Sequence, residues 1–226
     1  MTKQTKPKSR KKTLITIILS VFALFVLPLA AVFLRGLYLG AGTKGERIAA
    51  YENPRSALLV IDAQNDTWNN ARYSRNKEDV MTKVNTAVEW ADNNGVLVIY
   101  IKMEISNPLD LLLSQGNYKK GSDGAQLTDR LILPSEYIYS KNRNDTFSNE
   151  AFDSFLKERQ IDILYLVGAD AGGCVYGTAK GGINRGYKVE ILKDAVFSLS
   201  DKIMGKMLEQ YQKDKIGVNT VEILCG

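Results

Sequence analysis

The sequence predicts a doubly wound α/β domain preceded by one transmembrane helix. The expected domain is a three-layer α/β/α sandwich whose mostly parallel sheet has six strands in the order 3-2-1-4-5-6. Three observations support this fold class. Short, continuously apolar runs are typical of strands covered on both faces of a parallel sheet. These runs alternate with amphipathic helical patterns, as in doubly wound folds. An uncharged stretch of 21 residues lies near the N-terminus.

That uncharged stretch is residues 14–34, LITIILSVFALFVLPLAAVFL. As a helix it would extend about 31 Å, which is enough to cross the hydrocarbon core of a bilayer. Pro28 would kink such a helix but is tolerated in a membrane. The alternative is a cleaved signal peptide with a small-residue site at 40–42. Because the stretch is longer than the usual apolar region of a signal peptide, we expect an uncleaved anchor.

Charge flanking the anchor predicts its orientation. The first 12 residues contain six Lys or Arg and no acidic residue, which places a basic tail, residues 1–13, in the cytoplasm. We therefore expect a single-pass membrane protein that contacts the lipid bilayer through residues 14–34. A linker over 35–54 would lead to a domain over 55–226 on the extracytoplasmic side.

The composition excludes several kinds of chemistry. Removing the six basic tail residues from the total of 30 leaves 24, against 25 acidic residues. The domain thus has no basic excess, and binding to nucleic acid is not expected. The chain has no histidine, which removes Ser-His-Asp and Cys-His catalysis and His-ligated zinc. Any catalytic base must be a carboxylate, a lysine or a tyrosine, and no metal site is expected.

The predicted elements follow one another in the order that the fold requires. Strands are expected at 57–61, 96–101, 137–139, 163–167, 188–192 and 220–224. Helices are expected at 77–93, after Ser148-Asn149-Glu150, from Cys174, and around 201–211. Residues 103–135, broken repeatedly by Gly, Pro and Asp, form a long irregular loop. A loop of this length is more often functional than structural, for example as a lid.

Reactive side chains follow the ends of four predicted strands: Asp62, Lys102, Lys141 and Cys174. In doubly wound sheets the ligand binds at the carboxyl ends of the strands, beside the point where the strand order reverses. Asp62 and Cys174 would flank this point. Cys174 also begins a helix, whose unpaired N–H groups and dipole favour a thiolate. A thiol, a carboxylate and a lysine therefore converge, with both lysines as candidates. The simpler alternative for Cys174 is a small buried apolar residue.

Three motifs stand in a fixed order along the chain. Residues 62–66 read DAQND, Lys141 is followed by Phe147, and residues 168–175 read GADAGGCV. Together they resemble the DxQND segment, the lysine with its SAF segment, and the glycine-to-CV elbow of the isochorismatase-like cysteine hydrolases. This family includes the nicotinamidases. The resemblance covers roughly residues 55–226.

The resemblance implies a Cys-Asp-Lys triad. Cys174 would be the nucleophile, Asp62 its general base, and Lys141 a cation that holds Asp62 and lowers the pKa of the thiol. Backbone N–H groups of the elbow would form an oxyanion hole, shaped by a cis peptide at Ala169–Asp170. The implied activity is hydrolysis of a small amide-type C–N bond through a Cys thioester, with no cofactor.

The family pattern also implies roles for the residues around the triad. Lys102 is expected to be a solvated or ion-paired strand end, and Asp66 a local cap or loop acceptor. Gln64, Trp68 and Phe147 are the expected contacts to a small-molecule substrate. Thr67 stands where family members often carry Phe, so Trp68 would replace that aromatic wall or belong to the core.

Two other functions stay open at the level of sequence. One is a catalytically silent binding domain of the same fold, because the histidines of the nicotinamidase metal site are absent after the second strand. The other is hydrolysis of an ether, as in isochorismatases, which can lack the cysteine. Family members often associate, so a homo-oligomer is also compatible with the resemblance. Cys225, at the end of the last predicted strand, would lie about 9.6 Å from the fourth strand, too far for an easy disulfide with Cys174.

Overall fold

The structure is a computed structural model that describes residues 10–73 and 76–226. It consists of two compact units, Met1–Leu39 and Gly40–Gly226. The first nine residues, which make up most of the predicted basic tail, lie outside the described part of the chain.

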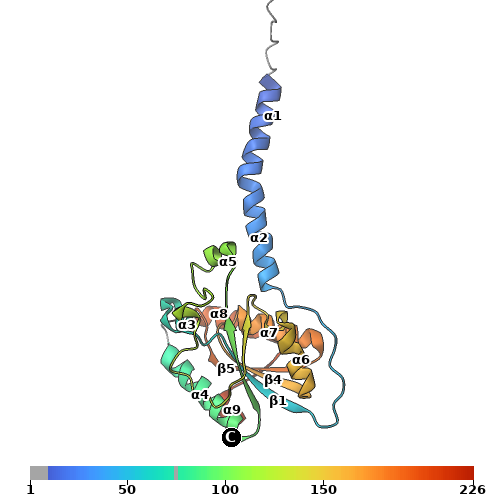
Figure 1. Cartoon of the computed structure of the whole chain (residues 1–226), viewed down its shortest axis with the longest axis vertical. Helices are drawn as coiled ribbons and strands as arrows, with labels where there is room; N and C mark the ends of the chain where they lie inside the picture. The colour runs from blue at the N-terminus through green and yellow to red at the C-terminus, as the bar shows by residue number, and fades with distance from the viewer. Residues whose placement is uncertain (1–9, 74–75) are drawn as a thin grey trace, which may run out of the picture. The chain divides into compact units, whose positions relative to one another are not determined.

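The N-terminal unit is helical. Helix α1 (Arg10–Val21) continues through a π-helical turn (Phe22–Val26) into α2 (Leu27–Gly40) (Figure 1). The wide turn directly precedes Pro28, which has no N–H to donate and whose ring crowds the preceding turn of a regular α-helix. By length and composition, Lys12–Gly40 could cross a membrane, and its most apolar window is wholly exposed.

A parallel sheet forms the centre of the second unit. Its six strands lie in the order β3-β2-β1-β4-β5-β6, and every neighbouring pair is parallel. This confirms the predicted fold class and strand order. Residues 57–61 are all fully buried, as their continuous apolarity predicts. The strands are β1 (Arg55–Ile61), β2 (Leu97–Met103), β3 (Ile138–Lys141), β4 (Ile161–Gly168), β5 (Lys188–Val196) and β6 (Gly217–Asn219).

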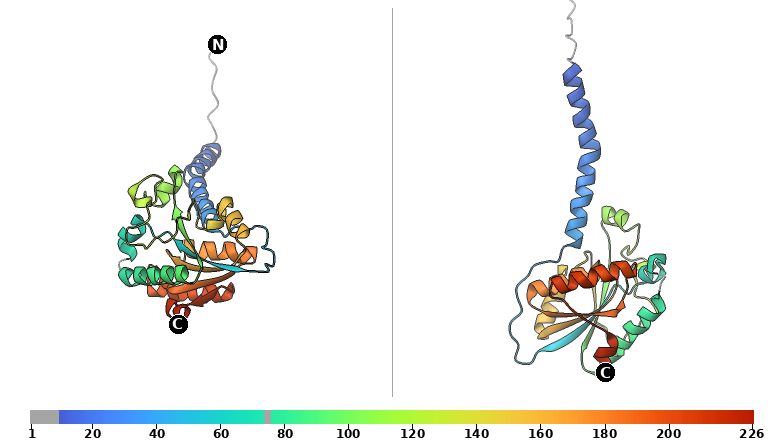
Figure 2. Two further views of the ribbon diagram at one scale, coloured as in Figure 1. Left: turned by 60° about the horizontal axis from the view of Figure 1, so that its bottom comes forward. Right: turned by 180° about the vertical axis from the view of Figure 1, so that it is seen from behind.

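Two layers of helices cover the sheet (Figures 1 and 2). One layer contains α6 (Glu150–Glu158), α7 (Cys174–Arg185) and α8 (Asp201–Lys213). The other contains α4 (Lys77–Asn93) and α9 (Val221–Cys225). Helix α4 has the predicted bounds, because its apolar residues recur at helical spacing on one face. The buried ones are Met81, Val84, Ala87, Val88 and Ala91.

The C-terminal end differs from the prediction. Residues 220–224 are not a strand, because β6 ends at Asn219 and α9 follows. The side chain of Thr220 caps this helix by accepting a hydrogen bond from the N–H of Ile223 at 3.3 Å. Its β-branched residues favour a strand only weakly, and tertiary contacts override that preference. Cys225 consequently lies exposed on a helix rather than at the end of a strand, and both cysteines are free.

Three further segments complete the domain. The chain leaves β1 through the short helix α3 (Asn65–Asn69). The long loop between β2 and β3 contains α5 (Pro108–Leu113) and a 3-10 turn (Asp123–Ala125). The linker was expected over residues 35–54. Residues 35–40 belong to α2, whereas residues 41–54 have no helix or strand but pack on the domain. For example, the N–H of Ile48 donates to the carbonyl of Arg185 at 2.8 Å.

Candidate active site

A buried ion pair marks the carboxyl edge of the sheet. Asp62 follows β1 and Lys141 ends β3, and the lysine side chain reaches past the intervening strand β2. Its Nζ lies 2.8 Å from Asp62 Oδ2, and the two residues are only 4% and 3% exposed. Breaking such a pair would leave an uncompensated buried charge, so each partner strongly fixes the other.

The structure distinguishes the two candidate lysines. Lys102 does not pair with Asp62; its Nζ lies 3.7 Å from Glu104 Oε1 near the surface. Lys102 is therefore an ion-paired strand end, as the family pattern indicates, and Lys141 is the lysine that contacts Asp62.

The second carboxylate oxygen of Asp62 is unoccupied. Asp62 Oδ1 is buried and has no hydrogen-bond partner among the described residues. The backbone of Asp62 has φ +50°, an uncommon conformation for a residue other than glycine. Two hydrogen bonds hold it there: Thr67 Oγ1 donates to the carbonyl of Asp62 at 2.6 Å, and the N–H of Asp62 donates to Ile101 at 2.9 Å. The site thus presents a fixed, buried proton acceptor.

Cys174 begins α7, directly after the elbow that follows β4. The residue as a whole is half-buried, and both Asp62 and Lys141 lie close enough to influence the pKa of its thiol. The thiol also donates to Asn144 Oδ1 at 3.8 Å. Burial and the Asp62 carboxylate raise the pKa of Cys174 well above its usual range, and Lys141 lowers it only in part. This corrects the expectation of a lowered pKa: the resting site holds a protonated thiol.

Glycine is required at the start of the elbow. Gly168 has φ +105°, and a Cβ there would lie 2.0 Å from the carbonyl oxygen of Ile61. The two residues are register partners in β4 and β1. Only glycine lets the strands approach this closely while the chain turns toward Cys174.

The elbow also supplies backbone donors. The Ala169–Asp170 peptide is cis, as expected. The N–H groups of Ala169 and Ala171 donate to carbonyls of neighbouring strands and loops. By contrast, the N–H groups of Asp170 and Cys174 find no acceptor within the described part of the chain. Unpaired N–H groups at a helix start are a ready site for a negatively charged oxygen.

Two tyrosines bond to the segments that follow Asp62 and precede Cys174. Tyr118, from the long loop, has its hydroxyl 2.9 Å from Thr67 Oγ1, and its N–H donates to Asp66 Oδ2 at 2.6 Å. Asp66 is thus a loop acceptor, as expected. The hydroxyl of Tyr73 donates to Asp170 Oδ2 at 2.7 Å. Burial is the largest cause that raises the pKa of both tyrosines, and the Asp170 carboxylate adds to the shift of Tyr73 as the Asp62 carboxylate does to that of Tyr118. Sequence reasoning missed both residues. For Tyr118 the signal was only the length of the loop that contains it, and Tyr73 lies outside that loop.

Gln64 has a structural role. Its side chain is fully buried, and its amide donates to the carbonyls of Met103 at 2.9 Å and Ala125 at 2.8 Å. Its Oε1 accepts from the N–H of Met103 at 2.8 Å. These bonds tie the long loop to the end of β1. They leave no amide group for a substrate, which corrects the expected role.

The two aromatic residues expected to contact the substrate, Trp68 and Phe147, are buried against other side chains. Trp68 is 8% exposed, and its ring lies 4.7 Å from Lys77 Nζ and 4.3 Å from Arg130 Cζ. Phe147 is 2% exposed and packs in the core, 5.2 Å from the ring of Phe152. Phe147 is therefore corrected to a packing residue, and Trp68 takes the second of the two roles expected for it, a residue of the core.

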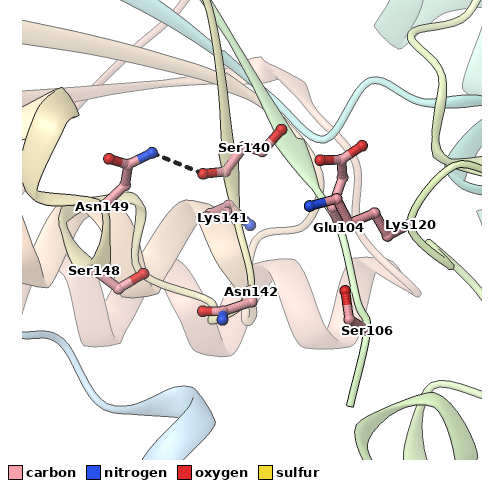
Figure 3. Close-up of a pocket in the computed structure, with 8 residues that line it drawn as sticks. All are labelled: Glu104, Ser106, Lys120, Ser140, Lys141, Asn142, Ser148 and Asn149. Atoms are coloured by element: carbon pink, nitrogen blue, oxygen red, sulfur yellow. Dashed lines mark hydrogen bonds between the residues drawn. The ribbon is translucent and has the colours of Figure 1, made fainter. Parts of the chain in front are cut away.

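A polar cavity of about 280 Å³ reaches Lys141 (Figure 3). Glu104 and Lys120 lie on one side of it and Asn149 on the other. Opposite charges and amides in its wall suit a small polar molecule. The lining residues are Glu104, Ser106, Lys120, Ser140, Lys141, Asn142, Ser148 and Asn149. Within residues 10–73 and 76–226, no three His, Cys, Asp or Glu side chains gather as metal ligands would.

The family model of the isochorismatase domain matches residues 56–221. The chain belongs to the isochorismatase family. Among relatives of this hydrolase is the uncharacterized isochorismatase family protein PncA of Bacillus subtilis (strain 168). It is 26% identical over 164 residues, which cover 66% of this chain and 89% of the relative.

Two named amidases are also similar to this isochorismatase-family hydrolase. The ureidoacrylate amidohydrolase RutB of Cronobacter sakazakii (strain ATCC BAA-894) is 26% identical over 171 residues, covering 62% of this chain and 74% of the relative. The crystal structure of N-carbamoylsarcosine amidase from Thermoplasma acidophilum shares the fold with a TM-score of 0.66. The two are 21% identical, and the match covers 74% of this chain and 96% of that one.

Proposed function

We propose that this protein is a membrane-anchored cysteine hydrolase that cleaves the C–N bond of a small polar amide or ureide. The observation that carries the proposal is the buried Asp62–Lys141 pair at the sheet edge where Cys174 begins α7, with Asp62 Oδ1 left without a partner among the described residues. The two amidases among its relatives support a C–N substrate. The polar cavity at Lys141 supports a small, hydrogen-bonding one.

In the proposed first step, Cys174 Sγ attacks the carbonyl carbon of the substrate while the thiol proton passes to Asp62 Oδ1. The raised pKa of the thiol makes this transfer necessary, because little thiolate exists beforehand. Lys141 holds Asp62 by its other oxygen. The carbonyl oxygen becomes an oxyanion and accepts hydrogen bonds from the N–H groups of Asp170 and Cys174.

In the second step the tetrahedral intermediate collapses. The C–N bond breaks, the nitrogen leaves as an amine or ammonia with the proton that Asp62 held, and a thioester remains on Cys174. Water then attacks the thioester and gives its proton to Asp62, and the C–S bond breaks with return of the proton to sulfur. Tyr73 and Tyr118 would form the walls of the pocket in front of the thiol.

The test is turnover by the full chain in detergent micelles. Small amides, ureides and nitriles are assayed by mass spectrometry with the wild type, Cys174→Ala and Cys225→Ala. We expect Cys174→Ala to lower turnover at least about 10³-fold, whereas Cys225→Ala, on the exposed C-terminal helix, keeps it. Full turnover by Cys174→Ala would contradict the mechanism and favour ether hydrolysis. A folded wild type with no turnover and no reactivity of Cys174 would favour a silent binding domain.

We also propose that Lys12–Gly40 anchors the enzyme in a membrane with the basic tail in the cytoplasm. Its length and apolarity support an anchor, and the six basic residues among the first 12 support the orientation. Extraction of membranes with alkaline carbonate should leave the protein in the pellet. Protease added outside intact cells should digest the domain. Recovery of the domain in the soluble fraction, cut after residue 40, would indicate a cleaved signal instead.

A further inference from the structure

Residues 41–48, here called the N-terminal strap, are bound to the domain by a buried carboxylate. The N–H and the Oγ1 of Thr43 both donate to Asp145 Oδ2, each at 2.6 Å. Asp145 is fully buried. The strap lies outside residues 56–221, the part that matches the family model, and it directly follows α2. It therefore precedes the part of the chain that the family model matches.

An arginine of α7 also donates hydrogen bonds to the strap. Arg185 Nη1 donates to Thr43 Oγ1 at 3.0 Å and to the carbonyl of Thr43 at 3.2 Å, and Nη2 donates to the carbonyl of Lys44 at 3.2 Å. Its Nε donates to Asp153 Oδ2 at 2.9 Å. A Cβ at Gly45 would lie 2.6 Å from Arg185 Cζ. The strap thus packs closely against the Arg185 guanidinium and is not an unbound linker.

Asp145 connects the strap to the candidate active site. Its Oδ1 accepts from the N–H of Phe147 at 2.9 Å, which folds the loop 142–148 around the carboxylate. The next residue back, Asn144, places its Oδ1 3.8 Å from the Cys174 sulfur and accepts the thiol hydrogen bond. The carboxylate is therefore shared by the strap and by the loop that contacts the nucleophile.

We propose that Thr43 is a positioning residue, which fixes Asn144 against the Cys174 thiol through Asp145. The inference goes beyond the proposed function and rests on it only in taking Cys174 as the reacting group. Hydrogen bonds to a carboxylate are among the stronger ones. When one is lost, the buried Asp145 oxygen has fewer donors, and the loop 142–148 that folds around this carboxylate is held less firmly.

The sign of the effect follows from the contact to Asn144. Asn144 Oδ1 accepts from the S–H group and so stabilises the protonated thiol. When the loop loosens, this stabilisation weakens and the thiol becomes more acidic. Thr43→Val removes the hydroxyl that donates to Asp145, whereas Thr43→Ser keeps it. Thr82→Val is a matched control, because Thr82 Oγ1 only donates to the carbonyl of Glu78 on the exposed side of α4.

The experiment measures alkylation of Cys174 by iodoacetamide against pH in the full chain, read by peptide mass spectrometry. We expect Thr43→Val and Asn144→Ala each to move the midpoint of the profile about half a unit to lower pH. The double variant should move no further than the larger single shift, because both act through one contact. Thr43→Ser and Thr82→Val should match the wild type.

A second measurement separates this inference from the proposed function. Hydrogen exchange of peptides covering 142–148 should be about tenfold faster in Thr43→Val than in the wild type or Thr43→Ser. Failure of wild-type Cys174 to react, with faster exchange in Thr43→Val, would sink the proposed function and keep the strap contact. Unchanged exchange, an unchanged alkylation profile in Thr43→Val, or additive shifts in the double variant would each overturn the positioning role.

Discussion

At the scale of single residues, the two carboxylate oxygens of Asp62 have different surroundings, and the proposed mechanism uses this carboxylate where many hydrolases use histidine. One oxygen of Asp62 is held by Lys141, and the other is buried without a partner among the described residues. Burial alone would lower the pKa of Lys141, but the Asp62 carboxylate beside it raises this pKa above its usual value, so the lysine stays protonated. The result is a protonated thiol beside a fixed base, a pair that needs no imidazole.

The two charged neighbours should move the reactivity of Cys174 in opposite directions. Asp62→Asn removes a charge that raises the pKa of the thiol, so alkylation by iodoacetamide should become faster at neutral pH while amide turnover is lost. Lys141→Met removes a charge that lowers this pKa, so alkylation should become slower. Each midpoint should shift by about one pH unit, with Glu89→Gln, at an exposed position of α4, as an unshifted control. Slower alkylation in Asp62→Asn would contradict the assignment of charges.

Lys141 should also matter for stability. Lys141→Met leaves the Asp62 carboxylate buried and uncompensated, which should lower the free energy of unfolding by about 3–5 kcal/mol. The comparison is Lys102→Met, which breaks the outer pair with Glu104 and should cost less than about 1 kcal/mol. Urea titrations followed by circular dichroism measure both. Equal losses in the two variants would show that the Asp62–Lys141 pair has no special structural weight.

At the scale of elements, the elbow between β4 and α7 organises the site. It turns tightly at Gly168 because the strand lies against Ile61, and it then places the N–H groups of Asp170 and Cys174 at the start of α7. The hydroxyl of Tyr211 on α8 donates to the carbonyl of Ala171, which braces the elbow from the helical layer. The donors of the proposed oxyanion hole are thereby fixed by packing.

Two glycines on neighbouring elements should respond oppositely to alanine. Gly168→Ala brings a Cβ against the backbone of Ile61 at a positive φ, so it should cost about 3 kcal/mol or more. Gly205 lies in α8 with nothing within 4 Å of its added Cβ, so Gly205→Ala should stabilise by about 0.5–1 kcal/mol. Thermal unfolding measures both. A tolerated Gly168→Ala would mean that the elbow is not as tightly placed as described.

At the scale of the whole molecule, the sequence pattern predicted the central sheet better than it predicted the C-terminal helix, the strap and the tyrosines near the site. Continuous apolar runs and the helix at 77–93 follow from local periodicity, and the strand order follows from the fold class. The helix at the C-terminus was mispredicted because β-branched residues there favour a strand only weakly. The strap was missed because its contacts with Asp145 and Arg185 lie more than 100 residues away in the chain. Tyr73 and Tyr118 were missed because their partners are also distant in the chain, 97 residues away for Tyr73 and 51 for Tyr118.

The contacts of the strap imply that the stable domain begins near residue 41 and not at residue 55. A chain that starts at residue 40 keeps Thr43 and its contacts, whereas one that starts at residue 50 leaves Asp145 and Arg185 buried without them. The shorter chain should melt about 5–10 °C lower. Differential scanning calorimetry compares the two, and equal melting temperatures would show that residues 41–49 are dispensable.

The central claim is that Cys174 carries the acyl group during hydrolysis. The most direct measurement is intact-mass and peptide analysis of the full chain, quenched in acid during turnover of an amide or ureide substrate. We expect an adduct with the mass of the substrate acyl group on the peptide that contains Cys174, absent from Cys174→Ala and unaffected by Cys225→Ala. Sustained turnover with no adduct on Cys174, and with full activity in Cys174→Ala, would contradict the claim.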